Sequence, residues 1–205
     1  MDAQDALRNL QLELVRLRDE NRTLKEELTS LRGAVRGLDG LHDVIQRIRP
    51  GVDILQILDD LLASALSVVG ASDGSLLLLD EETNELVFAV VRGQAAERLR
   101  GYRLPPGRGI AGWVAAHRKA EVVHDVHADP RFYPDVDETF GFETHTLACV
   151  PLLEGNRVLG VIEAVNKSTA RGFLPQDHDL LLVVAVLASV AIRRAEVTTE
   201  ERGAA

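Results

Sequence analysis

The sequence predicts an α+β fold, in which helices flank an antiparallel sheet and a parallel dimeric coiled-coil helix precedes the whole. A leucine heptad pattern opens the chain. Two pairs of short apolar runs follow, each joined by a polar turn, and segments with a helical period lie before and after them. Locally paired strands with helices on either side are typical of the α+β class. The length of 205 residues suits one domain of about 150 residues plus the helical extension.

The first segment repeats hydrophobic residues every seven positions. With Leu7 at position a, every d position is a leucine, and three g-position glutamates each face a basic residue five positions later. In a parallel two-stranded coiled coil these g and e residues lie side by side, so all three pairs attract each other. Asn21 occupies an a position, where one polar residue favours paired, in-register helices. We expect a homodimer, with a trimer or an antiparallel pair as alternatives. The predicted dimerisation residues are Leu10, Leu14, Leu17, Asn21, Leu24, Leu28 and Leu31.

Breaks in these patterns divide the chain into predicted segments. The coiled coil covers residues 1–40, a linker helix 41–50, the main domain 51–197 and a disordered tail 198–205. Pro50-Gly51 separates the linker from the domain, because proline ends or bends a helix.

Within the main domain, the period of the apolar residues predicts both helices and strands. We expect helices over Val52–Val69, over Ile110–His117 and from Pro175 onward. We expect strands at Ser75–Leu79, Leu86–Val91, Glu121–Val123, Leu147–Leu153 and Val158–Val165. The polar segment Asp129–Phe142 is predicted to be a loop with one helical turn, and long ordered connectors of this kind often build sites.

Charge and composition exclude several classes of function. The net charge of −9 argues against nucleic acid as a partner, and the six residues before Leu7 lack the basic side chains of a DNA-binding zipper. The single cysteine, Cys149, rules out an intrachain disulfide. The longest apolar run, Leu180–Ile192, is shorter than a bilayer span, and no secretory signal opens the chain. We therefore expect a soluble cytoplasmic protein that does not bind a membrane.

Three glycines, Gly107, Gly109 and Gly112, spell G-x-G-x-x-G at the start of a predicted helix. A dinucleotide-binding loop is excluded, because prolines precede the glycines and no β-α-β unit follows. Backbone N–H groups at the start of a helix still favour an anion such as a cyclic phosphate. A tight turn without a ligand explains the same pattern, so both interpretations remain open.

A series of short motifs in the main domain resembles one known family. The chain reads Gly-Ile-Ala-Gly-Trp-Val-Ala from Gly109, Asp-Pro-Arg-Phe from Asp129, and Leu-Gly-Val-Ile-Glu-Ala-Val-Asn-Lys up to Lys167. Phe173 and Asp177 follow with the spacing F-x-x-x-D. In this order these motifs resemble the GAF domain, most closely the GAF domains of cyclic-nucleotide phosphodiesterases and adenylyl cyclases. The resemblance implies an antiparallel sheet of about six strands, a small-molecule pocket, and a regulatory role.

The resemblance also implies where a ligand and a structural ion pair would lie. In the resembling domains, residues equivalent to Lys167 and Asp177 tie the last strand to the last helix. Phe132 would stack on a ligand ring or fill the core. Glu163 would accept hydrogen bonds from a purine edge if its strand face meets the pocket, and would otherwise be a surface carboxylate. The predicted ligand-binding residues are Ser75, Gly109, Ile110, Ala111, Phe132, Asp137, Thr139, Thr146 and Glu163.

No arrangement of catalytic residues stands out, so we expect the chain not to be an enzyme. His124-x-x-His127 with Asp125 and Asp129 has loose metal-ligand character, but the spacing fixes no third strong ligand and we expect no metal. Some GAF domains reduce free methionine sulfoxide with several cysteines, and others hold a bilin through one. Cys149 lies within an apolar strand, so we expect it to be a buried small hydrophobe.

Two functions of different classes remain. In the first, a dimeric sensory module binds a small molecule, with a cyclic nucleotide as the candidate, between its sheet and the segment Gly109–Phe142. Binding is then passed through the coiled coil to an unknown signalling partner. In the second, the fold is a ligand-free dimerisation and docking scaffold, and its own side chains fill the pocket. An open cavity with convergent polar groups would favour the first function.

Overall fold

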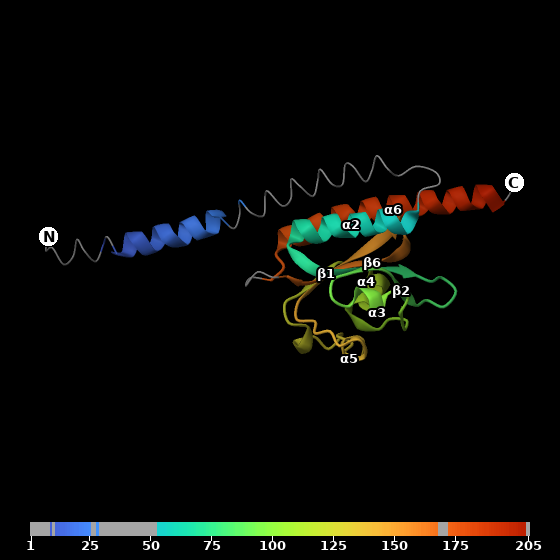
Figure 1. The fold of residues 1–205 in the computed structure, drawn as a ribbon, viewed down its shortest axis with the longest axis horizontal. Helices are drawn as coiled ribbons and strands as arrows, with labels where there is room; N and C mark the ends of the chain where they lie inside the picture. Colours follow the sequence, from blue (N-terminus) through green and yellow to red (C-terminus); the bar gives the residue numbers. More distant parts are fainter. Residues whose placement is uncertain (1–8, 10, 26–27, 29–52, 168–171, 204–205) are drawn as a thin grey trace.

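The computed structural model describes residues 9, 11–25, 28, 53–167 and 172–203, with side chains described as far as residue 197. Residues 11–25 form a helix (Figure 1), and three of its heptad leucines, at positions 14, 17 and 24, are exposed in the single chain. The predicted dimerisation residues Leu10 and Leu31 and the predicted linker helix 41–50 lie outside the described residues. Within the described part, no helix is both long enough and apolar enough to cross a membrane.

Six strands form one antiparallel sheet in the order β3-β2-β1-β6-β5-β4. In chain order they are β1 (Ala71–Leu79), β2 (Leu86–Arg92), β3 (Arg103–Leu104), β4 (Glu121–Val123), β5 (Leu147–Glu154) and β6 (Arg157–Lys167). Strand β6 pairs with both β1 and β5, and every residue from Leu159 to Val165 is buried. The predicted class is confirmed, with an antiparallel sheet flanked by helices (Figure 1).

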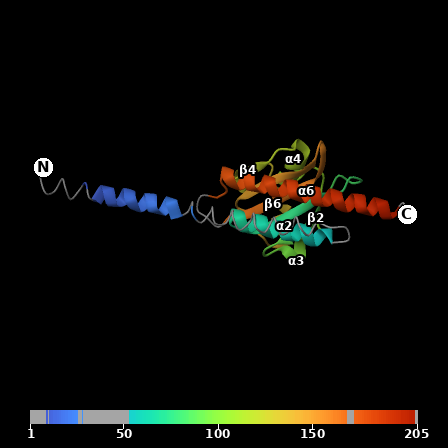
Figure 2. The same ribbon diagram turned by 90° about the horizontal axis from the view of Figure 1, so that it is seen from above.

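Two long helices, α2 (Ile54–Val69) and α6 (Pro175–Gly203), lie side by side over one face of the sheet (Figures 1 and 2). Helix α2 begins where the Asp53 carboxylate accepts a hydrogen bond from the Leu55 N–H. It ends at Gly70, whose left-handed conformation suits a residue without a Cβ. The helices and the sheet enclose an aliphatic core, whose fully buried members include Leu58, Leu61, Leu62, Ile162 and Leu181.

Shorter elements cover the opposite face. They are α3 (Ala96–Leu99), α4 (Gly109–His117), the 3-10 turn η1 (Val126–Ala128) and α5 (Asp135–Phe140). Helix α4 buries Ile110, Ala111 and Val114 in a second core against the sheet. Helix α5 has no fully buried residue. This face is therefore covered less completely than the face beneath α2 and α6, and it is where a pocket can form.

The structure differs from the sequence prediction at short elements and at the C-terminus. Helix α3 and the two-residue strand β3 were not predicted, because segments this short carry no periodic signal. We predicted a disordered tail at 198–205, which is wrong for residues 198–203 because α6 continues to Gly203. Glu200, Glu201 and Arg202 have good helix propensity, and extending a helix that already exists is far easier than starting one.

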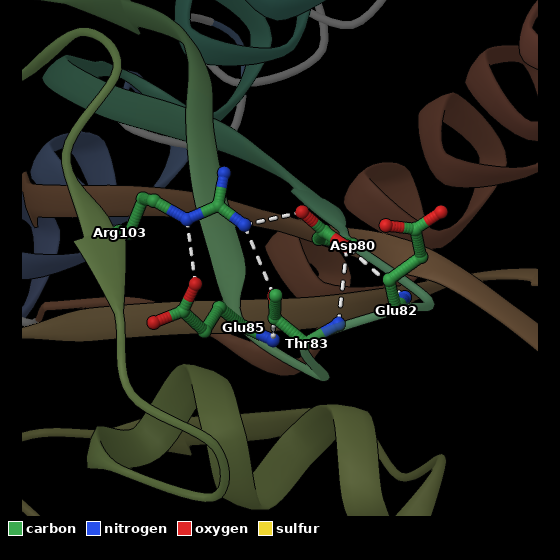
Figure 3. A network of polar contacts seen from close by, with 5 residues as sticks. All are labelled: Asp80, Glu82, Thr83, Glu85 and Arg103. Carbon is green, nitrogen blue, oxygen red and sulfur yellow. Dashed lines mark hydrogen bonds and ion pairs between the residues drawn. The ribbon is translucent and has the colours of Figure 1, made fainter.

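The turn between β1 and β2 is held by an arginine from β3 (Figure 3). Arg103 forms ion pairs with Asp80 and with Glu85, and its Nη2 also donates to Thr83 Oγ1 at 3.0 Å. Asp80 Oδ1 accepts hydrogen bonds from the backbone N–H groups of Glu82 and Thr83. The hydrogen bonds from Arg103 are the main reason that the pKa values of both carboxyls are lowered. The network fastens the short strand β3 to the hairpin beside it.

The predicted ion pair between Lys167 and Asp177 is present and nearly buried. Lys167 Nζ lies 2.5 Å from Asp177 Oδ2, and the two side chains are only 9% and 5% exposed. The same carboxylate oxygen accepts a hydrogen bond from the Leu174 N–H at 2.7 Å. Lys167 ends β6 and Asp177 lies in the first turn of α6, so the pair joins the central strand to the last helix.

Replacing Asp177 should destabilise the domain strongly. Asp177→Ala leaves the Lys167 ammonium buried without its counterion, and we expect the free energy of unfolding to fall by about 3–5 kcal/mol in urea denaturation. Asp179→Ala is the matched control on the same helix turn. Its side chain is 78% exposed, and a change within about 0.5 kcal/mol is expected. If the two substitutions lowered the free energy of unfolding equally, the buried ion pair would contribute no more to stability than an exposed carboxylate does.

Candidate functional site

A small cavity lies on the second face of the sheet, between strand β6 and the helices α4 and α5. Its volume is about 80 Å³. Its polar residues are Tyr133, Asp137, Thr144 and Glu163, and a mostly apolar wall with a few convergent polar groups is typical of small-molecule sites. The lining residues are Phe88, Leu104, Gly109, Ile110, Ala111, Phe132, Tyr133, Val136, Asp137, Thr144, Leu147, Glu163 and Val165.

Glu163 is a buried carboxyl on the sheet side of this cavity. It lies on the central strand β6, opposite Ser75 on β1 and opposite Cys149 on β5. Its Oε2 accepts a hydrogen bond from Ser75 Oγ at 2.7 Å. Among the described residues this is the only hydrogen bond of the carboxyl, so Oε1 is left for a ligand or for water. The sequence did not decide whether the face of β6 that carries Glu163 meets a pocket or the solvent. In the structure this face lines the cavity.

Burial changes the acid–base behaviour of this row of side chains. The pKa of Glu163 is raised to about 7, mainly by loss of hydration; the hydrogen bond from Ser75 lowers it in part, and the charge of Asp137 adds a smaller upward contribution. Burial also raises the pKa of the Cys149 thiol, with smaller contributions from the charges of Glu163 and Glu121. The thiol therefore stays protonated and unreactive, as expected for a buried small hydrophobe.

Helix α5 closes the cavity and is held by few contacts. Asp137 Oδ2 accepts a hydrogen bond from the Thr144 N–H at 2.6 Å, and Asp137 Oδ1 accepts one from Thr144 Oγ1 at 2.9 Å. Phe140 meets Tyr102 edge-on, with ring centroids 5.1 Å apart. Helix α5 buries none of its residues completely, whereas α4 buries Ile110, Ala111 and Val114, so opening α5 exposes less fully buried surface than opening α4.

The glycines before α4 have separate roles. A Cβ on Gly112 would lie 2.5 Å from the carbonyl carbon of Gly107, so the two backbones touch and Gly112 must lack a side chain. Gly107 and Gly109 both have φ near +70°, which glycine adopts without strain. The tight-turn interpretation therefore explains the motif. Gly109 also lines the cavity, and the side chain of the N-cap residue Arg108 makes no capping hydrogen bond. The start of α4 thus still offers backbone N–H groups to a ligand.

Arg131 fixes the Asp129–Phe132 motif in place. Its guanidinium binds both carboxylate oxygens of Asp129, reaches Glu121 on β4 at 3.3 Å, and lies 4.5 Å from the ring centroid of Trp113 on α4. The hydrogen bonds from Arg131 lower the pKa of Asp129. Phe132, the next residue, then points into the cavity wall and contacts His127 edge-on. The motif therefore has a positioning role.

The structure brings most of the predicted ligand-binding residues together. Gly109, Ile110, Ala111, Phe132, Asp137 and Glu163 line the cavity. Ser75 lies behind this wall and reaches it only through Glu163. Thr139 is exposed on α5 and lies outside the wall. Thr146 also lies outside it, near Gly172, and its buried hydroxyl makes no hydrogen bond among the described residues.

Three polar or aromatic residues of the wall, Phe88, Tyr133 and Thr144, were not among the predicted ligand-binding residues. The role of Thr144 depends on a hydrogen bond to Asp137 across seven residues. Spacing alone does not reveal such a bond, because both residues lie in a segment without a regular period.

Comparison with known proteins identifies the family. The family model described as GAF domain matches residues 53–192, and the chain therefore belongs to the GAF family. Members of this family are generally regulatory, ligand-binding modules without catalytic activity, and the described fold agrees with that class.

The curated relatives include cyclic phosphodiesterases. The chain is 31% identical over 141 residues to the probable 3',5'-cyclic phosphodiesterase pde-5 of Caenorhabditis elegans, a match that covers 64% of this chain and 19% of that protein. It is 39% identical over 85 residues to the cone cGMP-specific 3',5'-cyclic phosphodiesterase subunit alpha' of Mus musculus, covering 42% of this chain and 10% of that protein. The matches thus span only 19% and 10% of the length of these relatives.

Solved structures share the fold at low sequence identity. The GAF domain of a phosphoenolpyruvate-protein phosphotransferase from Coxiella burnetii aligns with a TM-score of 0.69 and 20% identity, covering 82% of this chain and 98% of that chain. Free methionine-R-sulfoxide reductase from Neisseria meningitidis aligns with a TM-score of 0.64 and 24% identity. The alignment covers 80% of this chain and 92% of that chain. One of these similar folds belongs to an enzyme and the other to a domain of a larger protein, so the fold alone does not decide the activity.

The buried Glu163 should make stability depend on pH. The folded state holds its proton more tightly than the unfolded state, so the free energy of unfolding falls as pH rises from 4.5 to about 7. A shift of this size corresponds to roughly 3 kcal/mol. Glu163→Gln carries no charge, so it should be more stable than the unmodified protein at about pH 8, and the advantage should vanish near about pH 4.5.

Urea denaturation of both proteins across this pH range measures the difference. Glu138→Gln, at an exposed carboxyl on α5, is the control and should follow the unmodified protein at every pH. A constant offset between Glu163→Gln and the unmodified protein would mean that Glu163 does not titrate in this window.

Proposed function

We propose that the chain is a non-catalytic sensory module, which binds a small molecule in the cavity beneath α4 and α5 and signals through a coiled-coil dimer to a partner protein. The observation that carries this proposal is the buried Glu163 carboxyl, which faces the cavity with one oxygen free of protein hydrogen bonds among the described residues. A buried polar group is stable only when it is hydrogen-bonded. A ligand that donates to Glu163 would complete this arrangement.

The lining defines what such a ligand should look like. The two carboxyls, Glu163 and Asp137, favour hydrogen-bond donors, such as the amino group and ring N–H of a purine. Phe132, Phe88 and Leu104 offer apolar and aromatic surface for a ring. The N-terminus of α4 at Gly109 favours a partial or full negative charge. A cyclic nucleotide combines all three features, and the relatives named as cyclic phosphodiesterases point to the same class.

A nucleotide needs more room than the cavity offers. Sites for drug-sized ligands usually measure about 300 Å³ or more, whereas this cavity is about 80 Å³. Binding would therefore require α5 to swing outward and the Asp137–Thr144 hydrogen bonds to break or re-form around the ligand. The movement of α5 would also be the signal, because the ligand would bind the open arrangement of α5 better than the closed one and so shift the equilibrium between them.

Titration with cAMP and with cGMP tests the ligand directly. We expect one of them to raise the melting temperature, by the equivalent of about 2.7 kcal/mol when its concentration is a hundred times the dissociation constant. Glu163→Gln should weaken the binding about tenfold or more, since hydrogen bonds to a charged group contribute about 1.5–3 kcal/mol. Glu138→Gln should bind normally. The absence of any shift with both nucleotides at about 1 mM would remove the cyclic-nucleotide proposal.

The small volume favours a second function, a ligand-free docking scaffold. About 80 Å³ holds a few waters and no nucleotide. In that case the wall would stay closed, and a crystal structure grown with millimolar nucleotide would show α5 unmoved. Native mass spectrometry of freshly purified protein separates the two functions, because it reports a retained small molecule and the stoichiometry of the chain together.

The dimer part of the proposal rests on the exposed heptad face. In the single chain Leu14, Leu17, Leu24 and Leu28 are between 48% and 58% exposed. A continuous leucine stripe exposed to water is unfavourable, and pairing with a second helix would bury it. The polar residue Asn21 lies on the same stripe and would meet its counterpart across a parallel dimer.

Replacing Asn21 tests the coiled coil. Asn21→Leu should raise the thermal stability of the N-terminal segment and loosen the control of strand number, because the buried polar residue opposes stability and favours dimers. Analytical ultracentrifugation and circular dichroism measure these two effects. Asn9→Leu, which lies outside the a and d positions, is the control and should change neither. A monomer at micromolar concentration in the unmodified protein would refute the dimer.

A further inference from the structure

Two histidines and a glutamate converge at the rim of the domain, outside the cavity. His127 belongs to η1, and Glu143 and His145 lie in the segment that leads into β5. Their imidazole nitrogens and carboxylate oxygen all lie within 4.8 Å of one another, and all three side chains are exposed. The geometry points to a binding site for a divalent transition-metal ion, with zinc as the best fit.

The ligand set selects the kind of ion. Two imidazoles and one carboxylate suit zinc and its neighbours, whereas magnesium and calcium prefer oxygen ligands only. Around tetrahedral zinc, ligand atoms lie roughly 3–3.5 Å apart. Since His145 Nε2 is already 3.9 Å from Glu143 Oε1, small rotations of these exposed side chains bring the donors to zinc distance. A water molecule would complete the tetrahedron.

The backbone beneath these side chains is fixed, which separates this cluster from a chance meeting of surface residues. The Val126 N–H donates to the His145 carbonyl at 3.0 Å and so joins η1 to the second segment. Asn166 holds the other two ligand residues, because its Oδ1 accepts from the His145 N–H at 2.7 Å and its Nδ2 donates to the Glu143 carbonyl at 2.7 Å. The three Cα positions are therefore set before any ion arrives, and only side-chain rotations remain.

The sequence had offered a different set, His124 and His127 with the aspartates between and after them. The fold assigns those aspartates to local structure, since Asp125 caps η1 and Asp129 binds Arg131. His124 lies against Gly172 instead of joining the cluster. Only His127 of that group belongs to the proposed site, and its partners come from a segment that begins sixteen residues later in the chain.

The site adjoins the cavity through Thr144 and through Phe132, whose ring meets His127 edge-on. Thr144 stands between Glu143 and His145, and both its N–H and its hydroxyl donate to Asp137 on α5. An ion bound by the flanking residues would therefore hold the segment that keeps α5 closed. The metal site itself is argued from its own ligands and does not depend on what binds in the cavity.

Zinc titration of the full chain tests the site. Protein treated with a chelator and dialysed is titrated with Zn²⁺ by calorimetry, and Co²⁺ is added in a second experiment to follow its visible absorption. We expect one ion per chain and an intense absorption band typical of tetrahedral Co²⁺. His127→Gln and His145→Gln should each weaken binding by more than about tenfold, since even partners outside the coordination shell contribute that much.

The neighbouring exposed His124 provides the matched control. His124→Gln should bind Zn²⁺ as the unmodified protein does. Glu143→Gln, at a side chain that is 76% exposed, removes the third ligand with no risk to the core and should also weaken binding. Circular dichroism confirms that each variant is folded. Binding that survives the loss of His127 and His145, or no binding at about 100 µM Zn²⁺, would overturn the proposal.

Discussion

The central strand β6 is buried on both faces, and the rest of the structure follows from this constraint. The helices α2 and α6 cover one face of the sheet with an aliphatic core, while α4 and the irregular segments cover the other. A strand enclosed on both sides should contain only apolar residues. Glu163 breaks this rule in the middle of β6, so its carboxyl must either be neutral or find a partner. The cavity lies beside this carboxyl, so a ligand or water in it can be the partner of Glu163.

The irregular face is held together by short polar side chains that bind backbone groups. Asp125 caps η1, Asp137 binds the Thr144 N–H, and Asn166 binds three backbone groups between residues 143 and 146. In a sheet, the backbone N–H and C=O groups are paired by hydrogen bonds between strands. In these loops, side chains make the hydrogen bonds to the backbone groups instead. They also make the loops precise enough to carry a site.

The sequence predicted the sheet, the main helices and the family because these depend on apolar period and on local motifs. The resemblance also put Gly109, Phe132 and Glu163 among the predicted ligand-binding residues, although it left open whether the strand face of Glu163 meets the pocket. The Asp137–Thr144 hydrogen bonds and the meeting of His127 with His145 depend on how two aperiodic segments lie in space, so no spacing rule predicted them. The continuation of α6 past residue 197 was missed because polar composition was read as disorder.

Strand β6 is joined to α6 at both of its ends. At one end Lys167 binds Asp177, and at the other Arg157 binds Glu196 with Nη1–Oε2 at 2.9 Å. The second pair is half-exposed and individually weak, but it shares its guanidinium with Glu81 and Glu154. Glu163 lies on the strand between these two anchors. Strand β6 is therefore fastened to α6 by ion pairs at both ends, and a displacement of the sheet at Glu163 would be passed to the C-terminal helix through these two contacts.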